Sequence, residues 1–232
     1  MNRILNFMST LMINPTKMNL TKICLLFFLL AGSLSLFSQE FYGGVLGGFN
    51  GSKVRNDRSL GYNKMGLIAG AWVQRDINEN FYWGMEIKIN QKGSRKVPTK
   101  DDPLKYVYRL NYIDLPVLFG YQYKPYISFF AGLSYGYLFN KNSYDVYGFD
   151  PLAEYTNISN WELGMFAGIK VDFDQLVKKE WARKFMLETR FQNSVLSIDK
   201  SHEFFTYYLA IGQYNNVIST VLYYRIEWRN KN

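Results

Sequence analysis

The segment 81–92 alternates residue by residue, and this alternation constrains the fold more than any other feature of the chain. One parity is apolar and begins with aromatic residues: Phe81, Trp83, Met85, Ile87 and Ile89. The other parity is polar, charged or small apart from one tyrosine: Tyr82, Gly84, Glu86, Lys88, Asn90 and Lys92. Because a strand places alternate side chains on opposite faces, the segment predicts a sheet with one apolar and one polar face.

The same alternation recurs and predicts eight strands, at about residues 41–50, 65–75, 80–92, 106–122, 125–139, 160–173, 183–193 and 216–228. Long polar connections (51–64, 93–105, 140–159, 194–215) alternate with shorter ones (76–79, 123–124, 174–182). Outer-membrane barrels combine an even strand number with short periplasmic turns and long outer loops. The predicted fold is therefore all-β: one eight-stranded antiparallel up-and-down transmembrane β-barrel with long extracellular loops and short periplasmic turns.

The first 38 residues have the features of an N-terminal extension and a cleavable signal peptide. Lys17 and Lys22 precede an apolar run at 23–36, and a small residue, Ser38, stands before polar sequence. The run is about 14 residues long, whereas a membrane-spanning helix needs roughly 20. We expect residues 1–38 to be removed and residues 39–232 to form the barrel domain.

The composition of the mature chain excludes several kinds of site. Cys24 is the only cysteine and lies in the apolar run, so cleavage would leave no disulfide and no thiolate metal site. Removing the signal would leave 24 basic residues against 19 acidic ones, lowering the net charge from +8 to +5. Many of the charges lie in strands and alternate in sign, so they predict internal pairing and no nucleic-acid partner.

Alternation alone leaves open which face points inward. In a soluble periplasmic barrel of lipocalin type the apolar face would line a ligand cavity, whereas in a membrane barrel it contacts lipid. Two observations favour lipid: aromatic residues gather near the predicted strand ends, and the polar parity mixes glycine with both charge signs, as a narrow barrel interior requires. The expected aromatic girdles contain Phe81, Trp83, Phe119, Tyr121, Tyr137, Trp161, Phe173, Phe185, Phe191 and Trp228.

The charged residues of the polar parity are expected to form an internal network of ion pairs and hydrogen bonds. Unpaired charges in a closed interior are costly, so both signs should be present. Five acids and five bases leave no lining of a single sign, which argues against an ion-selective pore and favours a structural network. The predicted members are Glu86, Lys88, Lys92, Asp114, Glu162, Lys170, Glu188, Arg190, Arg225 and Glu227.

The chain offers little catalytic or metal-binding chemistry. His202 is the only histidine, in the sequence Ser201-His202-Glu203 of the last long connection. Some outer-membrane lipid hydrolases use serine, histidine and an acid, but such a triad is assembled in space and seldom from adjacent residues. One histidine with scattered carboxylates is poor material for a metal site. We therefore expect no enzymatic activity, no cofactor and no metal, with an outer-membrane lipid-modifying enzyme as a less favoured alternative.

Four segments together resemble the PorT-like outer-membrane β-barrel family, and the resemblance covers nearly the whole mature chain. They are residues 43–50 (GGVLGGFN), 61–66 (GYNKMG), 85–93 (MEIKINQKG) and 112–118 (YIDLPVL). The resemblance implies an eight-stranded outer-membrane barrel of mostly uncharacterised role and supplies no catalytic residues. One member is linked to secretion of proteins across the outer membrane. The tail 229–232 after Trp228 departs from the terminal aromatic residue that barrel-assembly machinery commonly reads.

The sequence thus predicts a non-enzymatic, monomeric barrel in the bacterial outer membrane, exported through a cleaved signal peptide. A side-chain-filled interior leaves structural, surface-binding or accessory roles in a secretion or envelope complex. The expected partners are outer-membrane lipid and proteins of such a complex. The alternative is a soluble periplasmic lipocalin-like barrel that binds an apolar ligand.

Overall fold

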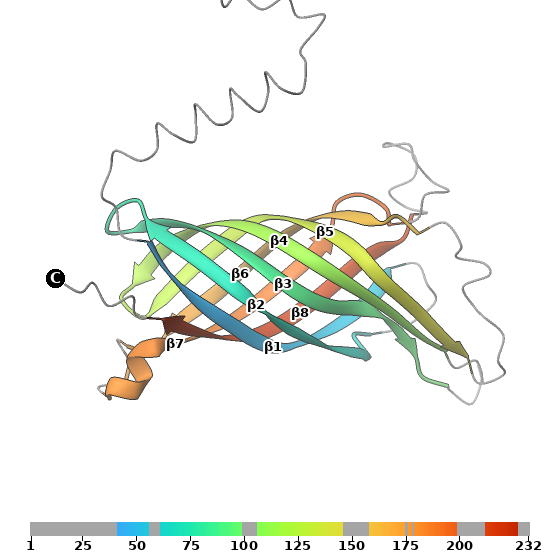
Figure 1. The fold of residues 1–232 in the computed structure, drawn as a ribbon, viewed down its shortest axis with the longest axis horizontal. Coiled ribbons are helices and arrows are strands. Elements are labelled where there is room, and N and C mark those ends of the chain that lie inside the picture. The colour runs from blue at the N-terminus through green and yellow to red at the C-terminus, as the bar shows by residue number, and fades with distance from the viewer. Residues whose placement is uncertain are drawn as a thin grey trace, which may run out of the picture. The chain divides into compact units, whose positions relative to one another are not determined.

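The computed structural model describes residues 41–55, 61–98, 106–145, 158–174, 176–177, 179–198 and 212–226. These residues form β1 (Phe41–Arg55), β2 (Lys64–Asp76), β3 (Phe81–Lys96), β4 (Tyr106–Lys124), β5 (Ile127–Asp145), β6 (Trp161–Asp172), the 3-10 helix η3 (Glu180–Lys184), β7 (Phe185–Ser194) and β8 (Tyr214–Ile226). Each strand pairs with the next in the chain, and β8 pairs with β1 (Figure 1). The predicted fold class, a closed eight-stranded barrel, is confirmed.

All eight ladders are antiparallel, and together they determine the stagger of the barrel. A path that starts at Gly43 and follows the paired residues once around the barrel returns to β1 at Lys53, so the stagger is 53 − 43 = 10 residues. In a closed barrel this stagger requires strands that tilt against the axis, as Figure 1 shows. The tilt decides which residues of distant strands meet inside.

The short connections lie at the end of the barrel where β1 begins, together with η3 (Figure 1). Between β2 and β3, the side-chain oxygen of Asn78 accepts hydrogen bonds from the backbone N–H groups of Asn80 and Phe81, at 2.9 and 2.8 Å. This is the local bonding by which asparagine stabilises tight turns. Short turns face the periplasm in outer-membrane barrels, so this end is expected to face the periplasm and we call it the periplasmic end. No helix among the described residues is long and apolar enough to cross a membrane.

Several strands extend farther than the sequence analysis predicts, mostly at the opposite, outer end. β1 continues to Arg55, β3 to Lys96 and β5 to Asp145, instead of residues 50, 92 and 139. Arg95 and Lys96, for example, still pair with β4. The predicted strand ends were placed where the alternation of apolar residues stops, which is expected at the edge of the lipid. Backbone hydrogen bonding between the strands continues beyond that point through polar sequence. At the other end β8 ends at Ile226 as described, and residues 227–232 lie outside the described residues.

Side-chain exposure determines which face points inward. Ile87 is 54 % exposed on the outside, whereas its neighbours Glu86 and Lys88 are 4 % and 2 % exposed inside the barrel. The other strands repeat the exposed apolar residues on the outer face, and their inner face buries polar and charged residues together with clusters of aromatic and aliphatic ones. The lipocalin-like alternative is therefore wrong, because it requires the apolar parity to line a cavity.

Glycines on the inner face provide room for large side chains from neighbouring strands. A Cβ at Gly120 would lie 2.0 Å from the ring of Tyr82, which is buried inside the barrel. A Cβ at Gly136 would lie 2.6 Å from a carboxylate oxygen of Asp114. The glycine-rich inner parity is thus the steric complement of the aromatic and acidic residues, as expected for an interior that side chains fill.

Candidate functional site

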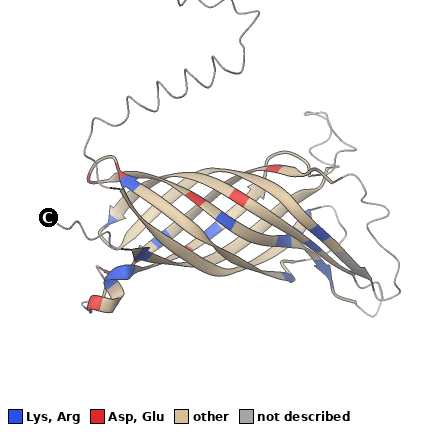
Figure 2. Ribbon diagram, in the orientation of Figure 1, with Lys and Arg blue, Asp and Glu red and all other residues tan. Residues whose placement is uncertain are grey.

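The polar interior of the barrel is the most distinctive site of the molecule. Figure 2 shows acidic and basic residues interspersed along the strands. Eight of the ten predicted network residues are buried, four acids and four bases: Glu86, Asp114, Glu162, Glu188, Lys88, Lys92, Lys170 and Arg190. Their formal charges cancel, which is the condition for burying so many ionised groups in a closed space.

Five charged residues and one tyrosine form the Arg190 cluster, defined as Glu86, Lys88, Lys170, Glu188, Arg190 and Tyr223. The Arg190 guanidinium donates two hydrogen bonds to Glu86, from Nη2 at 2.6 Å and Nη1 at 3.2 Å. Its Nε donates a third to Glu188 at 2.8 Å. The planar guanidinium thus bridges two carboxylates, a geometry that lysine could not reproduce.

Further donors and rings complete the Arg190 cluster. Lys88 Nζ and the Tyr223 hydroxyl donate to Glu86 at 2.8 and 2.7 Å. Lys170 Nζ lies 3.6 Å from Glu188 Oε2 and 4.5 Å from the centre of the Tyr223 ring. Arg190 itself lies 4.2 Å from the ring centre of Phe166, an arrangement that stabilises a desolvated cation.

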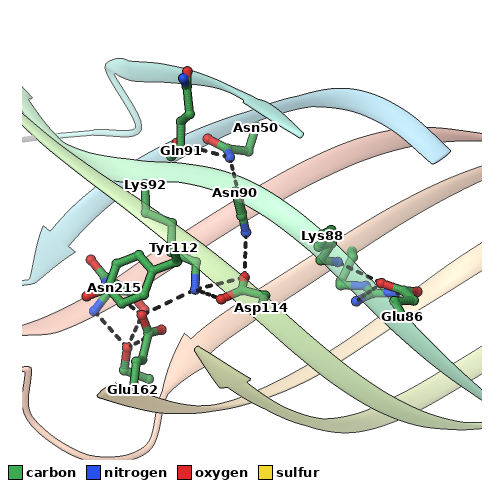
Figure 3. A network of polar contacts seen from close by, with 12 residues as sticks. Asn50, Glu86, Lys88, Asn90, Gln91, Lys92, Tyr112, Asp114, Glu162 and Asn215 are labelled. Carbon is green, nitrogen blue, oxygen red and sulfur yellow. Dashed lines mark hydrogen bonds and ion pairs between the residues drawn. The ribbon is translucent and has the colours of Figure 1, made fainter. Parts of the chain in front are cut away.

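The second group, the Lys92 cluster, consists of Asn50, Asn90, Lys92, Tyr112, Asp114, Glu162, Ser194 and Asn215, of which Figure 3 labels all but Ser194. Lys92 Nζ joins its two acids, donating to Asp114 at 3.0 Å and to Glu162 at 3.2 Å. Its ammonium group also lies 4.6 Å from the centre of the Tyr112 ring. Removing Lys92 would leave two carboxylates facing each other in a space from which water is excluded.

Amide side chains extend the Lys92 cluster across the barrel. Asn50 donates to Asn90 at 2.6 Å, and Asn90 donates to Asp114 at 2.9 Å. On the other side, Asn215 and Ser194 each donate to Glu162 at 2.8 Å. Side chains from six strands, β1, β3, β4, β6, β7 and β8, are therefore linked through Lys92 and its two acids, as Figure 3 shows for most of them.

The two remaining predicted network residues differ from the other eight. Arg225 donates to Asp172 at 2.9 Å near the periplasmic end, and both side chains are partly exposed, so this pair lies apart from the two clusters. Glu227 lies outside the described residues. Sequence reasoning omitted several buried members of the clusters: Asn50, Asn90, Tyr112, Ser194, Asn215 and Tyr223. Their positions on the inward parity of their strands were the signal that could have identified them.

The predicted girdle residues mostly lie on the outer surface. Phe81, Phe119, Tyr121, Tyr137, Trp161 and Phe191 are exposed, whereas Trp83, Phe173 and Phe185 are partly buried and Trp228 lies outside the described residues. Near the periplasmic end, the Phe81 ring packs on those of Phe119 and Tyr121, with centroids 5.6 and 5.2 Å apart. Such aromatic belts mark the membrane–water interface.

The placement of Phe191 corrects one predicted girdle position. Phe191 pairs with Ala167, which lies six residues along β6 from Trp161 (167 − 161), whereas Tyr137 pairs with Trp161 itself. Phe191 therefore lies nearer the middle of the apolar band than Tyr137 and Trp161 do. The prediction judged its position by distance from the strand end, which the tilt and unequal lengths of the strands make unreliable.

The clusters offer little chemistry beyond charge neutralisation. Each acid is surrounded by basic or amide donors and is shielded from water, and no group of three or more histidine, cysteine or acidic side chains suited to a metal occurs in the described ranges. His202 and the neighbouring Ser201 and Glu203 lie outside the described residues. The geometry is that of a closed structural core.

Comparisons with known proteins identify one matching family and some similar solved structures. No curated protein matches the chain. Among solved structures, Ail, the attachment invasion locus protein of Yersinia pestis, is 12 % identical, with 81 % of this chain and 99 % of that chain covered and a TM-score of 0.43. Neisserial surface protein A is 10 % identical, with 81 % and 97 % covered and a TM-score of 0.44. The family model described as "Outer membrane protein beta-barrel domain" matches residues 37–200, well over half of the chain. The chain belongs to this family of outer-membrane β-barrel proteins.

Proposed function

We propose that this protein is a non-enzymatic, monomeric outer-membrane barrel that acts through its surfaces. In this role it is a structural or surface-binding element, or an accessory of a secretion or envelope complex. The PorT-like resemblance of the sequence supports the last of these. Export would use the signal peptide at 1–38, with the barrel domain at 39–232 remaining in the membrane.

The closed interior is the observation that carries this proposal. Fully buried side chains follow one another along the barrel axis, from Tyr223 and Arg190 through Lys92 and Tyr112 to Leu110. Each of these is no more than 1 % exposed. A water-filled channel would expose such residues, as the linings of porins are exposed. The interior therefore supports the barrel and does not conduct.

The outer end offers the surface for a partner. β4 and β5 contain 19 residues each, whereas a tilted strand crosses a bilayer in about 9–11 residues. The hairpin therefore extends well beyond the lipid. Arg95, Arg109 and Lys141 are exposed near this end of β3, β4 and β5. A projecting, hydrogen-bonded platform with basic side chains is suited to contacts with an envelope protein.

The proposal is tested by photo-crosslinking in intact cells. A photoreactive residue replacing Lys141 should form crosslinks to a defined protein, whereas the same residue replacing Ile87, which faces lipid, should not. Planar-bilayer recordings of the purified barrel should show no steady conductance. Stable ion channels, or equal crosslinking from both positions, would contradict the proposal.

The enzymatic alternative has its own experiment. A lipid hydrolase built on this chain would need His202, because no other histidine is present. Purified wild-type protein and a His202→Ala variant should show the same background rate on a phospholipid substrate. Hydrolysis by the wild type that the variant loses would establish an enzyme and overturn the proposed function.

A further inference from the structure

The lipid-facing surface of β1 and β2 is hollowed near the periplasmic end. Small residues, Gly43 and Ala71, form the floor, and Phe41, Val45 and Ile226 are among the larger side chains around it. The hollow has a volume of about 550 Å³ and a mainly apolar lining. This lies within the roughly 300–1,000 Å³ of typical small-molecule sites. Other parts of the outer face carry larger exposed side chains such as Ile87 and Leu133.

A cation lies beside this hollow on the same outward-facing parity. The strand register pairs Arg75 with Phe41 on one side and with Trp83 on the other. These residues lie two positions closer to the periplasmic end than the neighbouring pair of Gly43 and Val73. The Phe41 ring contacts the Trp83 ring edge-on, with centroids 6.0 Å apart, and the guanidinium carbon of Arg75 lies 5.6 Å from the Phe41 centroid. Arg75 therefore lies at the level of the aromatic belt, where lipid headgroups meet the protein.

Among the described residues, no carboxylate forms an ion pair with the Arg75 guanidinium. Its Nε is buried and has no hydrogen-bond partner among the described residues. The adjacent acid, Asp76, instead accepts a hydrogen bond of 2.5 Å from the Tyr42 hydroxyl. In the barrel interior, by contrast, Arg190 bridges two carboxylates. A cationic donor at the edge of an apolar hollow suits an amphipathic ligand that combines a phosphate group with an apolar chain.

We propose that this hollow binds one phospholipid molecule of the periplasmic leaflet. The phosphate would accept hydrogen bonds from Arg75, whose fork of N–H groups matches phosphate geometry. One acyl chain would lie along Gly43 and Ala71 and contact the apolar walls. The site goes beyond the proposed function, because it concerns a lipid held at one position of the barrel wall and requires no protein partner.

The simpler interpretation is that Arg75 is an interfacial arginine that contacts many lipid molecules in turn. Gly43 is unsuitable for a test of lipid binding, because a Cβ there would lie 2.6 Å from the carbonyl oxygen of Trp72 and would disturb the strand itself. The substitution that fills the hollow is therefore made at Ala71, because its side chain is exposed in the hollow. Ala69 is two residues away on the same face and outside the hollow, so it supplies a matched control.

The experiment is a lipid titration of the delipidated, full barrel in detergent, read by native mass spectrometry. Dipalmitoyl phosphatidylethanolamine is the probe, and dipalmitoylglycerol, which lacks the phosphate, is the comparison. Lys124 is an exposed basic residue at the periplasmic end of β4 and outside the hollow, so Lys124→Gln is the control for loss of charge. We expect wild type, Ala69→Phe and Lys124→Gln to retain one phospholipid. Ala71→Phe and Arg75→Gln should each bind it at least tenfold more weakly, and dipalmitoylglycerol should not be retained.

Folding is checked separately by heat-modifiable migration in detergent gels. If Ala71→Phe fails to fold, Arg75→Gln still tests the proposal, because it changes only a partly exposed side chain and should leave folding intact. Retention of several equivalent lipids, equal retention of dipalmitoylglycerol, or wild-type binding by Arg75→Gln would overturn the proposal.

Discussion

Arg190 provides the sharpest test of the idea that the barrel interior is held together by compensated charge. Replacing it with methionine keeps an unbranched apolar side chain beside Phe130 and Phe166 but removes the guanidinium. Glu86 would lose two hydrogen bonds and Glu188 one. The eight buried network charges would change from four acids and four bases to four acids and three bases.

The expected cost follows from this geometry. Removing one partner of a buried ion pair typically destabilises a protein by about 3–5 kcal/mol, because the remaining charge stays buried without compensation. Lys88 and Tyr223 still donate to Glu86, so Arg190→Met should fall inside this range and not above it. At about 1.4 kcal/mol per tenfold change, the unfolding equilibrium should shift by roughly a hundredfold to several thousandfold.

The measurement is urea unfolding of the barrel refolded into lipid vesicles, followed by tryptophan fluorescence and analysed by linear extrapolation. Arg183→Met is the control, because Arg183 is 66 % exposed and pairs with Asp174 at 3.5 Å on the surface. That change should cost less than about 1 kcal/mol. A double variant, Glu86→Gln with Arg190→Met, should be more stable than additivity predicts, by roughly 0.5–3 kcal/mol.

Two results would refute this reasoning. If Arg190→Met cost no more than Arg183→Met, the buried ion pairs would contribute nothing particular to stability. If the double variant showed strict additivity, Glu86 and Arg190 would not depend on each other despite their 2.6 Å contact.

Three further predictions test other parts of the structure. Ile87→Lys, on the lipid face, should impair membrane insertion by about 2–4 kcal/mol, far more than Lys88→Gln. Vesicle-insertion assays measure this, and similar insertion of both variants would contradict the assigned faces. Tyr223→Phe should cost roughly 1.5–3 kcal/mol in urea unfolding because Glu86 loses a donor, whereas Tyr224→Phe, on the outer face, should cost almost nothing. Gly120→Ala should lower the free energy of unfolding by about 1–3 kcal/mol in urea unfolding, because its Cβ clashes with the Tyr82 ring. Combining it with Tyr82→Leu should relieve part of that cost, and no rescue in the double variant would argue against the contact.

The sequence predicts a large part of this architecture because its main signal is local. Alternation along 81–92 separates Ile87 from Glu86 and Lys88 without reference to any other strand, and eight such segments with alternating connections imply a closed barrel. The choice between lipid and cavity for the apolar face was correctly inferred from the aromatic ends and the mixed charges. Strand ends were less predictable, because pairing at Lys96 and Asp145 continues beyond the apolar pattern.

The partners inside the barrel depend on tertiary structure. Glu86 and Arg190 are 104 residues apart in the chain, and their contact requires the register of all the ladders that separate them around the barrel. The same stagger brings Asn215 to Glu162 and places Arg75 between Phe41 and Trp83. Alternation has a period of two residues and assigns a side chain to a face; it carries no information about which strand lies opposite. The sequence by itself therefore determined that this is an outer-membrane barrel with a polar interior, and the closed, staggered sheet decided which charges neutralise one another inside it.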